Sequence, residues 1–394
     1  MKYNIKNTEI IFITFFLTLI GCKGNKQSTA ELITVDVMAN YPKKELILQD
    51  FMDVEYIPLE TTDEFVCQGL VLAIGKDIIL ARNRVRDGDI FIYDRKTGKG
   101  LKKINREGQG GEEYTFIQRI VLNEEQNEIF VLDHFSRKIS VYDLDGNFKR
   151  SLKRGDELYF FYLYNFDHAN LITNNYWETD KTAFTIISKQ DGSTTKEIQI
   201  PFKEKISMAV SYSDKIKDIY YNVIPDNYNP IIPYFDSWVL VEQSSDTIYK
   251  YQSDHKMIPI IARSPSVQSM NPEVFLFLGV LTNRYYFMET VKKEYNFETY
   301  EGFPTTDLLY DKQEKAIFEY IVYNNDYSEK RAVNMKSLPV DDKIASWQSI
   351  EASQLIEDYE KGKLKGRLKE IAASLDEESN PVIMLIKHKK QTNP

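Results

Sequence analysis

The sequence predicts an all-β protein, a six-bladed β-propeller in which short antiparallel strands recur around a closed ring. The chain has 394 residues, among them 26 Tyr and 22 Phe, and this aromatic and β-branched composition favours strands. A short segment that ends in Tyr-Asp occurs twice, as Ile90–Asp94 and as Ile139–Asp143. A turn that contains glycine and a further strand follow each copy. Four short strands joined by polar turns form one propeller blade.

The second copy shows the complete repeating unit. Its predicted strands are Ile117–Leu122, Glu128–Leu132, Lys138–Tyr142 and Phe148–Leu152. Weaker copies of the third strand follow at Phe184–Ser188, Thr247–Tyr251, Asp307–Tyr310 and Val382–Ile386. Together with the first two copies these segments make six third strands, so we expect six blades.

The residues before the first blade are expected to close the ring. Few residues follow Val382–Ile386, and Val54–Leu59 precedes the first blade as a fourth strand would. We therefore expect Val54–Leu59 to be the outermost strand of the last blade, where Pro58 can be tolerated without a backbone N–H. Ile33–Val37 is expected to add a further edge strand. Closure of this kind protects sheet edges that would otherwise be exposed.

One helical segment is predicted inside the last blade. From Ser349 to about Leu375, apolar residues recur at the spacing of one helical face, and Lys, Glu and Arg fill the opposite face. Gly362 and Gly366 are expected to divide this insertion into two helices. We expect the insertion to pack on the outside of the ring.

The first residues indicate export rather than part of the fold. Lys2 and Lys6 precede the apolar stretch Ile10–Ile20, which is too short to span a bilayer core of ~30 Å but suits a signal peptide. The next residues complete Leu19-Ile20-Gly21-Cys22, which resembles the bacterial lipobox, in which the cysteine is lipidated and becomes the new N-terminus.

This pattern predicts three parts of the chain. Residues 1–21 are expected to be a lipoprotein signal peptide, and residues 22–31 a flexible polar tether. Residues 32–394 are expected to form the propeller, with the helical insertion at about 349–375. Cys22 would then carry several acyl chains, which together give a stable membrane anchor.

The charge argues against a nucleic-acid-binding protein, and the cysteine content argues against an intrachain disulfide. The formal net charge is −9, without the basic clusters of nucleic-acid-binding proteins, so we expect no nucleic-acid partner. The only cysteine besides Cys22 is Cys67, which excludes an intrachain disulfide once Cys22 is lipidated. Apolar neighbours predict that Cys67 is a buried structural thiol.

The second blade carries a resemblance to known propellers. Its segments Arg106–Tyr114, Val131–Asp133 and Arg137–Asp143 resemble the NHL-type repeat, which has a glycine-rich loop, an apolar-Asp step and then Arg-Ile-x-Val-Phe-Asp. The chain departs from that pattern at Gly110-Gly111, where Gly-Pro is expected. More closely, the layout resembles the six-bladed β-propeller lipoproteins common in Bacteroidetes. This resemblance implies a fold but no activity, because those lipoproteins have no agreed activity.

The same resemblance has an implication for the location of the protein. In these lipoproteins an acidic cluster just after the lipidated cysteine marks export to the cell surface. Here Lys23 and Lys26 occupy that region, and no acid does. The resemblance therefore implies a lipid anchor in the outer membrane that faces the periplasm, rather than the cell surface.

No catalytic pattern stands out from the sequence. The loop Gly108–Gly111 is followed by a predicted strand rather than by the helix that a phosphate site requires, so it is interpreted as a turn. The four histidines are far apart in the sequence and each is isolated: His134, His168, His255 and His388. A zinc site would need ligands from several blades, and serine lacks the Gly-x-Ser-x-Gly pattern of hydrolases. We therefore predict no metal ligand, no catalytic residue and no cofactor.

Clusters of aromatic residues are the stronger signal for function. Exposed aromatic rings with arginine are typical of surfaces that bind proteins, peptides or sugars. The candidate binding residues are Tyr176, Trp177, Tyr221, Tyr228, Tyr234, Arg284 and Tyr285. The alternative is that these rings fill the gaps between blades.

Two classes of function therefore remain open. The first is a membrane-tethered, non-enzymatic propeller that binds or scaffolds a protein, peptide or glycan in the cell envelope. The second is a propeller hydrolase or lyase with a metal site in the central channel. Three His, Asp or Glu ligands converging on one point of the channel would favour the second class.

Overall fold

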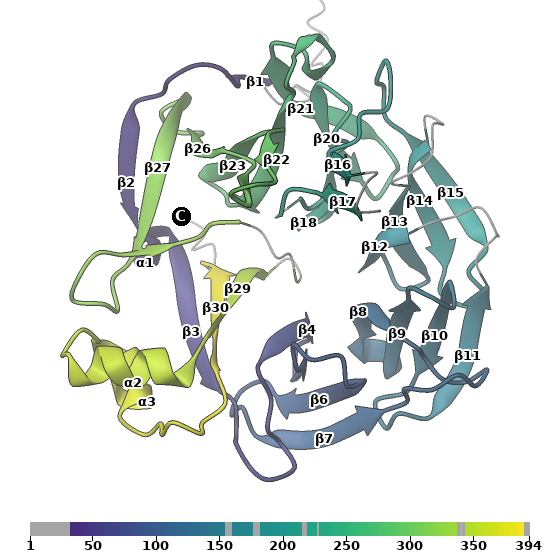
Figure 1. Ribbon diagram of the computed structural model, residues 1–394, viewed down its shortest axis with the longest axis vertical. Coiled ribbons are helices and arrows are strands. Elements are labelled where there is room, and N and C mark those ends of the chain that lie inside the picture. Colours follow the sequence, from purple (N-terminus) through teal and green to yellow (C-terminus); the bar gives the residue numbers. More distant parts are fainter. Residues whose placement is uncertain are drawn as a thin grey trace, which may run out of the picture. The chain divides into compact units, whose positions relative to one another are not determined.

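Six blades surround a central channel in the computed structural model (Figure 1). The structure describes residues 32–153, 160–175, 182–214, 219–226, 228–336, 340 and 343–389. Each segment predicted as a third strand lies in a different blade, so the predicted six-bladed fold is confirmed.

The first three blades each contain four antiparallel strands, paired in sequence order. The strands of the first blade are β4 (Leu70–Ile74), β5 (Ile78–Arg82), β6 (Asp89–Asp94) and β7 (Gly100–Asn105). Those of the second are β8 (Ile117–Asn123), β9 (Glu128–Asp133), β10 (Lys138–Tyr142) and β11 (Phe148–Lys153), with a 3-10 turn η1 (Glu124–Gln126) after β8. Those of the third are β12 (Phe160–Asn165), β13 (Asn170–Asn175), β14 (Thr182–Ser188) and β15 (Thr194–Gln199).

The other three blades recruit strands from the N-terminal part of the chain. The fourth blade has β18 (Ile231–Tyr234), β19 (Ser237–Leu240), β20 (Thr247–Gln252) and β21 (Met257–Ser264), then the 3-10 turn η2 (Val267–Ser269). The fifth has β22 (Val274–Leu281), β23 (Tyr285–Lys292), β26 (Thr305–Asp311) and β27 (Ala316–Asn324), and β28 (Arg331–Val333) pairs with β27. The sixth has β29 (Ile344–Ile350), β30 (Val382–His388) and β3 (Met52–Pro58).

The N-terminal segment runs along the outer edges of three successive blades. β1 (Ile33–Asp36) adds to β21 in parallel, and β2 (Lys43–Ile47) adds to β27 in parallel. The short helix α1 (Leu48–Phe51) then leads into β3, which pairs antiparallel with β30. The predicted closing strand is therefore confirmed, with Pro58 on an edge strand as expected. The further edge strand at Ile33–Asp36 belongs to the fourth blade.

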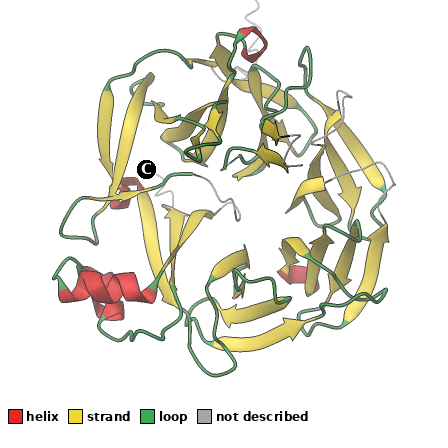
Figure 2. Ribbon diagram, in the orientation of Figure 1, coloured by secondary structure: helices red, strands yellow, loops and turns green. Residues whose placement is uncertain are grey.

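Two helices lie in the last blade between β29 and β30, as predicted. They are α2 (Ala352–Glu360) and α3 (Gly366–Ala372), and Gly362 and Gly366 both adopt positive φ where the helical run is broken. Leu355 and Leu368 pack with Met52 of β3 in one buried cluster, so the helices cover the outer edge of the blade (Figure 2). Within the described residues, no helix has both the length and the apolar character needed to cross a bilayer.

Packing between blades holds the ring together. Buried hydrophobic side chains form six clusters, one in each gap between neighbouring blades. The cluster between the last and first blades joins Ile57 and Leu385 to Phe91, and it includes Cys67, which is buried as expected. Full burial of each such side chain contributes about 1.5–3 kcal/mol, so both faces of every blade stabilise the ring.

Candidate functional site

The strand order defines two ends of the ring. Because successive strands of a blade are antiparallel, the turns between first and second strands all lie at one end, here called the first-turn end. The turns between second and third strands lie at the other, the second-turn end. His134 lies between β9 and β10, and so belongs to the second-turn end, as its place in the repeat predicts.

Three of the predicted contact residues are core residues instead. Tyr228 and Tyr285 are each 4% exposed, and Tyr234 is also buried. The Tyr228 hydroxyl donates a hydrogen bond to the carbonyl oxygen of Val241 at 2.7 Å, and its ring packs on Phe277. A buried ring cannot contact a partner at the surface, so these positions follow the alternative in which aromatic rings fill the gaps between blades.

Arg284 has a structural partner. Its guanidinium donates hydrogen bonds to both oxygens of Asp311, at distances of 2.9–3.2 Å. The carboxylate of Asp311 is fully buried and also accepts a hydrogen bond from Lys44. Arg284 therefore holds β26 within the fifth blade. The ion pair with Asp311 accounts for this arginine, so no binding partner needs to be invoked for it. Tyr176, Trp177 and Cys22 lie outside the described residues.

Tyr221 is the predicted contact residue that the structure exposes. It belongs to a hairpin of β16 (Val210–Asp214) and β17 (Ile219–Val223), which is inserted between the third and fourth blades. A second hairpin, β24 (Tyr295–Asn296) with β25 (Glu301–Gly302), is inserted between β23 and β26 of the fifth blade. Both insertions occur at the second-turn end.

Aromatic rings join the two hairpins. The ring centroid of Phe297 lies 5.3 Å from that of Tyr212 and 6.3 Å from that of Tyr221. An isolated two-stranded hairpin is marginally stable in water, so these contacts stabilise both insertions. We call the rings Tyr212, Tyr220, Tyr221, Phe297 and Tyr300 the hairpin aromatic surface.

Two of these rings, Tyr220 and Tyr300, lie outside the cluster between the hairpins, and Tyr220 points to the opposite face of β17 from Tyr221 because successive side chains of a strand alternate. Tyr220 is 68% exposed and Tyr300 is 71% exposed. The sequence interpretation missed Tyr212, Phe297 and Tyr300, although the aromatic spacing in Tyr295, Phe297 and Tyr300 is a signal that could have found the second hairpin.

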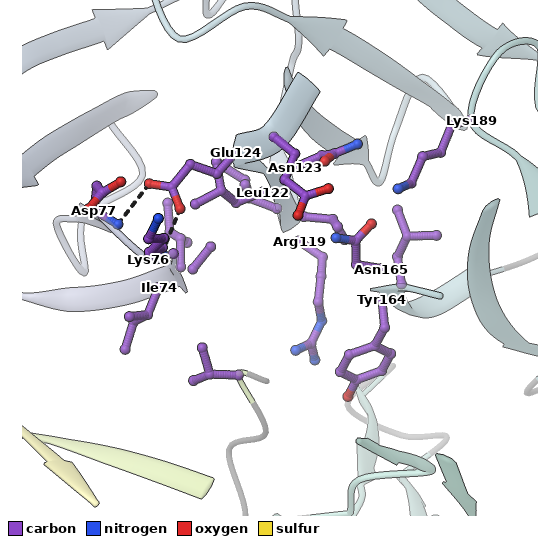
Figure 3. Close-up of a pocket in the computed structure, with 18 of the residues that line it drawn as sticks. Ile74, Lys76, Asp77, Arg119, Leu122, Asn123, Glu124, Tyr164, Asn165 and Lys189 are labelled. Atoms are coloured by element: carbon purple, nitrogen blue, oxygen red, sulfur yellow. Dashed lines mark hydrogen bonds between the residues drawn. The ribbon is translucent and has the colours of Figure 1, made fainter. Parts of the chain in front are cut away.

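A large cavity lies in the central channel (Figure 3). It has a volume of about 570 Å³ and is lined by the first strands and first turns of the first three blades. Val340 and Trp347 of the last blade complete its wall. On the side of the fourth and fifth blades the ring of Tyr228 packs on those of Tyr162 and Phe277.

A carboxylate fixes the rim of this cavity. Glu124 of η1 accepts hydrogen bonds from the backbone N–H groups of Lys76 and Asp77, at 2.5 and 2.9 Å. Gly75 allows this approach, because a Cβ there would lie 2.5 Å from Glu124 Oε2. The first turns of two neighbouring blades are thus locked together, as the dashed lines in Figure 3 show.

Two cationic side chains line the same cavity. The Arg119 guanidinium lies 4.7 Å from the centre of the Tyr162 ring, a cation–π contact. Lys189 follows β14, and its ammonium donates hydrogen bonds to the carbonyl oxygens of Asp167 at 2.5 Å and His168 at 3.3 Å. Burial lowers the pKa of Lys189 to about 8, although the carboxylates of Asp167 and Glu128 oppose that shift.

The histidines do not gather at one point. His168 lies beside Gln126 at the first-turn end, whereas His255 contacts Tyr251 in the fourth blade and His388 contacts Phe235. The described residues contain no group of three His, Cys, Asp or Glu side chains that could hold a metal ion.

Comparison with known proteins identifies the family. The family DUF5128, described as a 6-bladed beta-propeller, matches residues 23–345. The chain belongs to this family. Among curated protein sequences, none matches the chain.

Comparison with solved structures supports the fold through a protein from Bacteroides fragilis. A crystal structure of a Bacteroides fragilis protein, described as exported, covers 91% of this chain and 100% of its own, with 16% identity and a TM-score of 0.59. A member of the DUF4221 family from Bacteroides vulgatus covers 86% of this chain and 98% of its own, with 11% identity and a TM-score of 0.39. Virginiamycin B lyase from Staphylococcus aureus covers 69% and 94%, with 9% identity and a TM-score of 0.32. The last two similarities are too low to support an inference about this DUF5128 propeller.

Proposed function

We propose that this DUF5128 propeller is a membrane-tethered, non-enzymatic binding protein of the cell envelope. It recognises a protein or peptide partner through the hairpin aromatic surface. The observation that carries this proposal is the exposure of Tyr220 and Tyr300 on two hairpins that the propeller fold itself does not require.

The composition of the surface supports a protein partner. Tyr212, Tyr220, Tyr221 and Ile224 all belong to one short insertion and all are exposed. Grouped apolar side chains at the surface of a soluble domain indicate an interaction site, and tyrosine is among the residues enriched where binding energy concentrates. Each tyrosine offers a large apolar face and a hydroxyl at modest cost in conformational entropy.

The architecture of the surface also supports this function. The contacts of Phe297 with Tyr212 and Tyr221 hold the hairpins in place, so the outer rings are presented on a preorganised base. Preorganisation lowers the entropic cost of binding. Tyr212, Tyr221 and Phe297 make these contacts between the hairpins, whereas Tyr220 and Tyr300 do not. The second group can therefore be substituted without removing the contacts of the first.

Anchoring through Cys22 completes the proposal. The signal-like residues 1–21 and the polar residues 22–31 precede β1, and a lipid on Cys22 would hold the propeller at the membrane. Without an acidic cluster after Cys22, we assign the protein to the outer membrane with the propeller facing the periplasm.

The test compares partner capture by three forms of the lipidated protein in its own cell envelope. These are the wild type, the double variant Tyr220→Ala with Tyr300→Ala, and the control Tyr359→Ala, which removes an exposed tyrosine from α2. Photo-crosslinkers at positions 220 and 300 then identify the protein captured. We expect one partner to bind the wild type and the control, and the double variant to bind it at least about tenfold more weakly.

Two results would overturn the proposal. Equal binding of the partner by all three forms would show that the hairpin aromatic surface is not the contact site. Turnover of a substrate by the purified propeller, with no partner crosslinked at either position, would show that the protein is an enzyme.

A further inference from the structure

Arg119 brings to the central cavity a positive charge that forms no ion pair with a described residue. Arg119 has no hydrogen bond or ion pair with any described residue, and its contact is the Tyr162 ring. A guanidinium has five N–H donors in a fixed planar arrangement, and no described residue accepts a hydrogen bond from those of Arg119. These donors are therefore available to a ligand in the cavity.

A second cation points into the same space. Lys189 is 4% exposed and forms no ion pair with a carboxylate in the described residues. Its two hydrogen bonds go to backbone carbonyl oxygens, and an ammonium has three N–H donors. The third N–H can reach the cavity, toward which the side chain extends in Figure 3.

The carboxylates around the cavity either accept hydrogen bonds from backbone N–H groups or lie at the cavity rim. Glu124 binds two backbone N–H groups of the first blade. Asp167 accepts hydrogen bonds from the N–H groups of Ala169 and Asn170, both at 2.8 Å. Asp77 and Glu125 are exposed at the first-turn end. Neither Glu124 nor Asp167 forms an ion pair with Arg119.

Two further residues in the cavity wall, Tyr164 and Asn165, have side-chain polar groups without a hydrogen-bond partner in the described residues. The hydroxyl of Tyr164 is buried and unpaired, and the exposed side-chain amide of Asn165 likewise forms no hydrogen bond there. Buried polar groups in folded proteins are nearly always paired. In Figure 3, Arg119 extends toward Tyr164, and Asn165 lies between these side chains and Lys189.

We propose that the central cavity binds a small, ring-bearing organic anion whose carboxylate or phosphate oxygens accept hydrogen bonds from Arg119 and Lys189. Guanidinium groups bind both kinds of oxyanion in a bidentate manner. The volume of about 570 Å³ lies in the range of small-molecule sites. Tyr164 and Trp347 in its wall provide aromatic surface for a ring. This site is separate from the hairpin aromatic surface, so either proposal can fail without the other.

Calorimetric titration with four pyranoses tests the proposal. Glucuronic acid carries a carboxylate, glucose 6-phosphate carries a phosphate, glucose is neutral, and glucosamine is a cation. We expect at least one of the two anions to bind, and glucose and glucosamine to bind at least about tenfold more weakly. Whichever of the two anions binds more tightly identifies the oxyanion, carboxylate or phosphate, that the site prefers.

Three variants locate the binding. Arg119→Met removes the guanidinium and should weaken anion binding at least about tenfold. Arg86→Met is its matched control, because the Arg86 guanidinium also lies over an aromatic ring, that of Phe116 at 4.2 Å, but lines no part of the central cavity. Asn165→Asp is nearly isosteric at an exposed position, so it should keep the fold and repel the anion.

Specific results would overturn this assignment. Binding of glucose as tight as that of the anions would show that charge is not recognised. Anion binding that persists in a folded Arg119→Met or Asn165→Asp protein would place the anion elsewhere. Failure of both anions to bind at up to about 10 mM would also reject the proposal.

Discussion

Gly98 in the first blade and Pro58 in the last blade approach so closely that no side chain fits between them. A Cβ on Gly98 would lie 1.8 Å from the carbonyl oxygen of Pro58, and Gly98 has a φ of +72°. The backbone N–H of Glu60 donates a hydrogen bond to the carbonyl oxygen of Gly98 at 2.8 Å. The turn between β6 and β7 thus meets the closing strand β3 directly, and closure of the ring depends on this contact.

Substitution of Gly98 tests the importance of the closure. Gly98→Ala should lower the free energy of unfolding by about 3 kcal/mol or more, because the added methyl group must displace the backbone of β3 as well as adopt positive φ. Urea denaturation followed by circular dichroism measures this change.

Gly146 provides the matched control for Gly98. It occupies the same turn of the second blade with a φ of +81°, but a Cβ there would meet the side chain of Ile104 instead of backbone. Gly146→Ala should cost only about 1–2 kcal/mol, mainly for the backbone conformation. Equal losses for the two variants would mean that the approach to Pro58 has no special role.

The buried carboxylate of Asp311 should hold the N-terminal segment on the fifth blade. Lys44 of β2 and Arg284, the residue directly before β23, both bind it, and it is 0% exposed. Asp311→Asn should destabilise the protein by about 2–3 kcal/mol, because two partly buried cations lose their counter-ion. Glu314→Gln is the control, since Glu314 binds the same two cations from an exposed position and should cost less than about 1 kcal/mol. Thermal unfolding of both variants distinguishes these outcomes.

The same carboxylate predicts a specific response to acid. Burial alone would raise the pKa of Asp311, but the hydrogen bonds from Arg284 and Lys44 hold it well below its usual range. A depressed pKa in the folded state contributes stability above the unfolded pKa of about 3.9 and loses it as the pH falls below that value. Unfolding measured between about pH 5 and pH 2 should show a smaller loss of stability in Asp311→Asn than in the wild type, and parallel curves would refute this role.

Lys312 predicts a further pH dependence of stability, in base and with the same sign. Its ammonium lies 3.9 Å from the centre of the Tyr286 ring and donates hydrogen bonds to the hydroxyl of Tyr234 and the carbonyl oxygen of Thr282. Burial, together with the like charge of Lys250, lowers the pKa of Lys312 to about 8. Between about pH 8 and pH 10.4 the unfolded chain therefore binds more protons at this group, so its contribution to stability rises with pH.

The pH dependence of Lys312→Met checks this sign. The free energy of unfolding should rise less between about pH 8 and pH 10 in Lys312→Met than in the wild type. Lys196→Met, which changes an exposed lysine of β15, should leave the slope unchanged. An identical slope in Lys312→Met would show that the ammonium does not titrate in this range.

Lipidation at Cys22 is predicted from the sequence and can be tested directly. Cys22→Ala should move the protein from the membrane fraction to the soluble fraction, because the acyl chains supply the anchor. Metabolic labelling with an alkyne fatty acid should mark the wild type and the control Cys67→Ala, whose cysteine is buried in the fold, but not Cys22→Ala. Label on Cys22→Ala, or its retention in the membrane, would contradict the anchor.

Much of the fold could be predicted because blades repeat a local pattern. The strands around Tyr93 and Tyr142 share a pattern, an Ile three residues before a Tyr-Asp pair, and both tyrosine rings are buried. The closing strand with Pro58 and the break at Gly362 were also correctly predicted, since each follows from backbone chemistry at that residue. In contrast, β2 was missed, because Lys43–Ile47 has little apolar alternation of its own.

The candidate contact residues were less predictable. Tyr221 and Tyr228 belong to one Asn- and Pro-rich insertion and look alike in sequence, yet Tyr221 is exposed and Tyr228 is buried against Tyr162. The phenol ring suits both places, so composition cannot separate them. The sequence also contained no pattern that pointed to Arg119 as a binding residue, because the cavity that it lines is formed by residues from several blades.

The repeating unit, the number of blades, the strand that closes the ring and the helical insertion could all be predicted from the amino-acid sequence. These features depend on residues close together in the chain, whose periodicity and turn chemistry are local. The tertiary structure decided which aromatic rings face solvent, which cations lack a counter-ion and which blades receive β1 and β2. Those properties depend on contacts between distant segments, such as Tyr212 with Phe297 and Gly98 with Pro58, and no local pattern encodes such contacts.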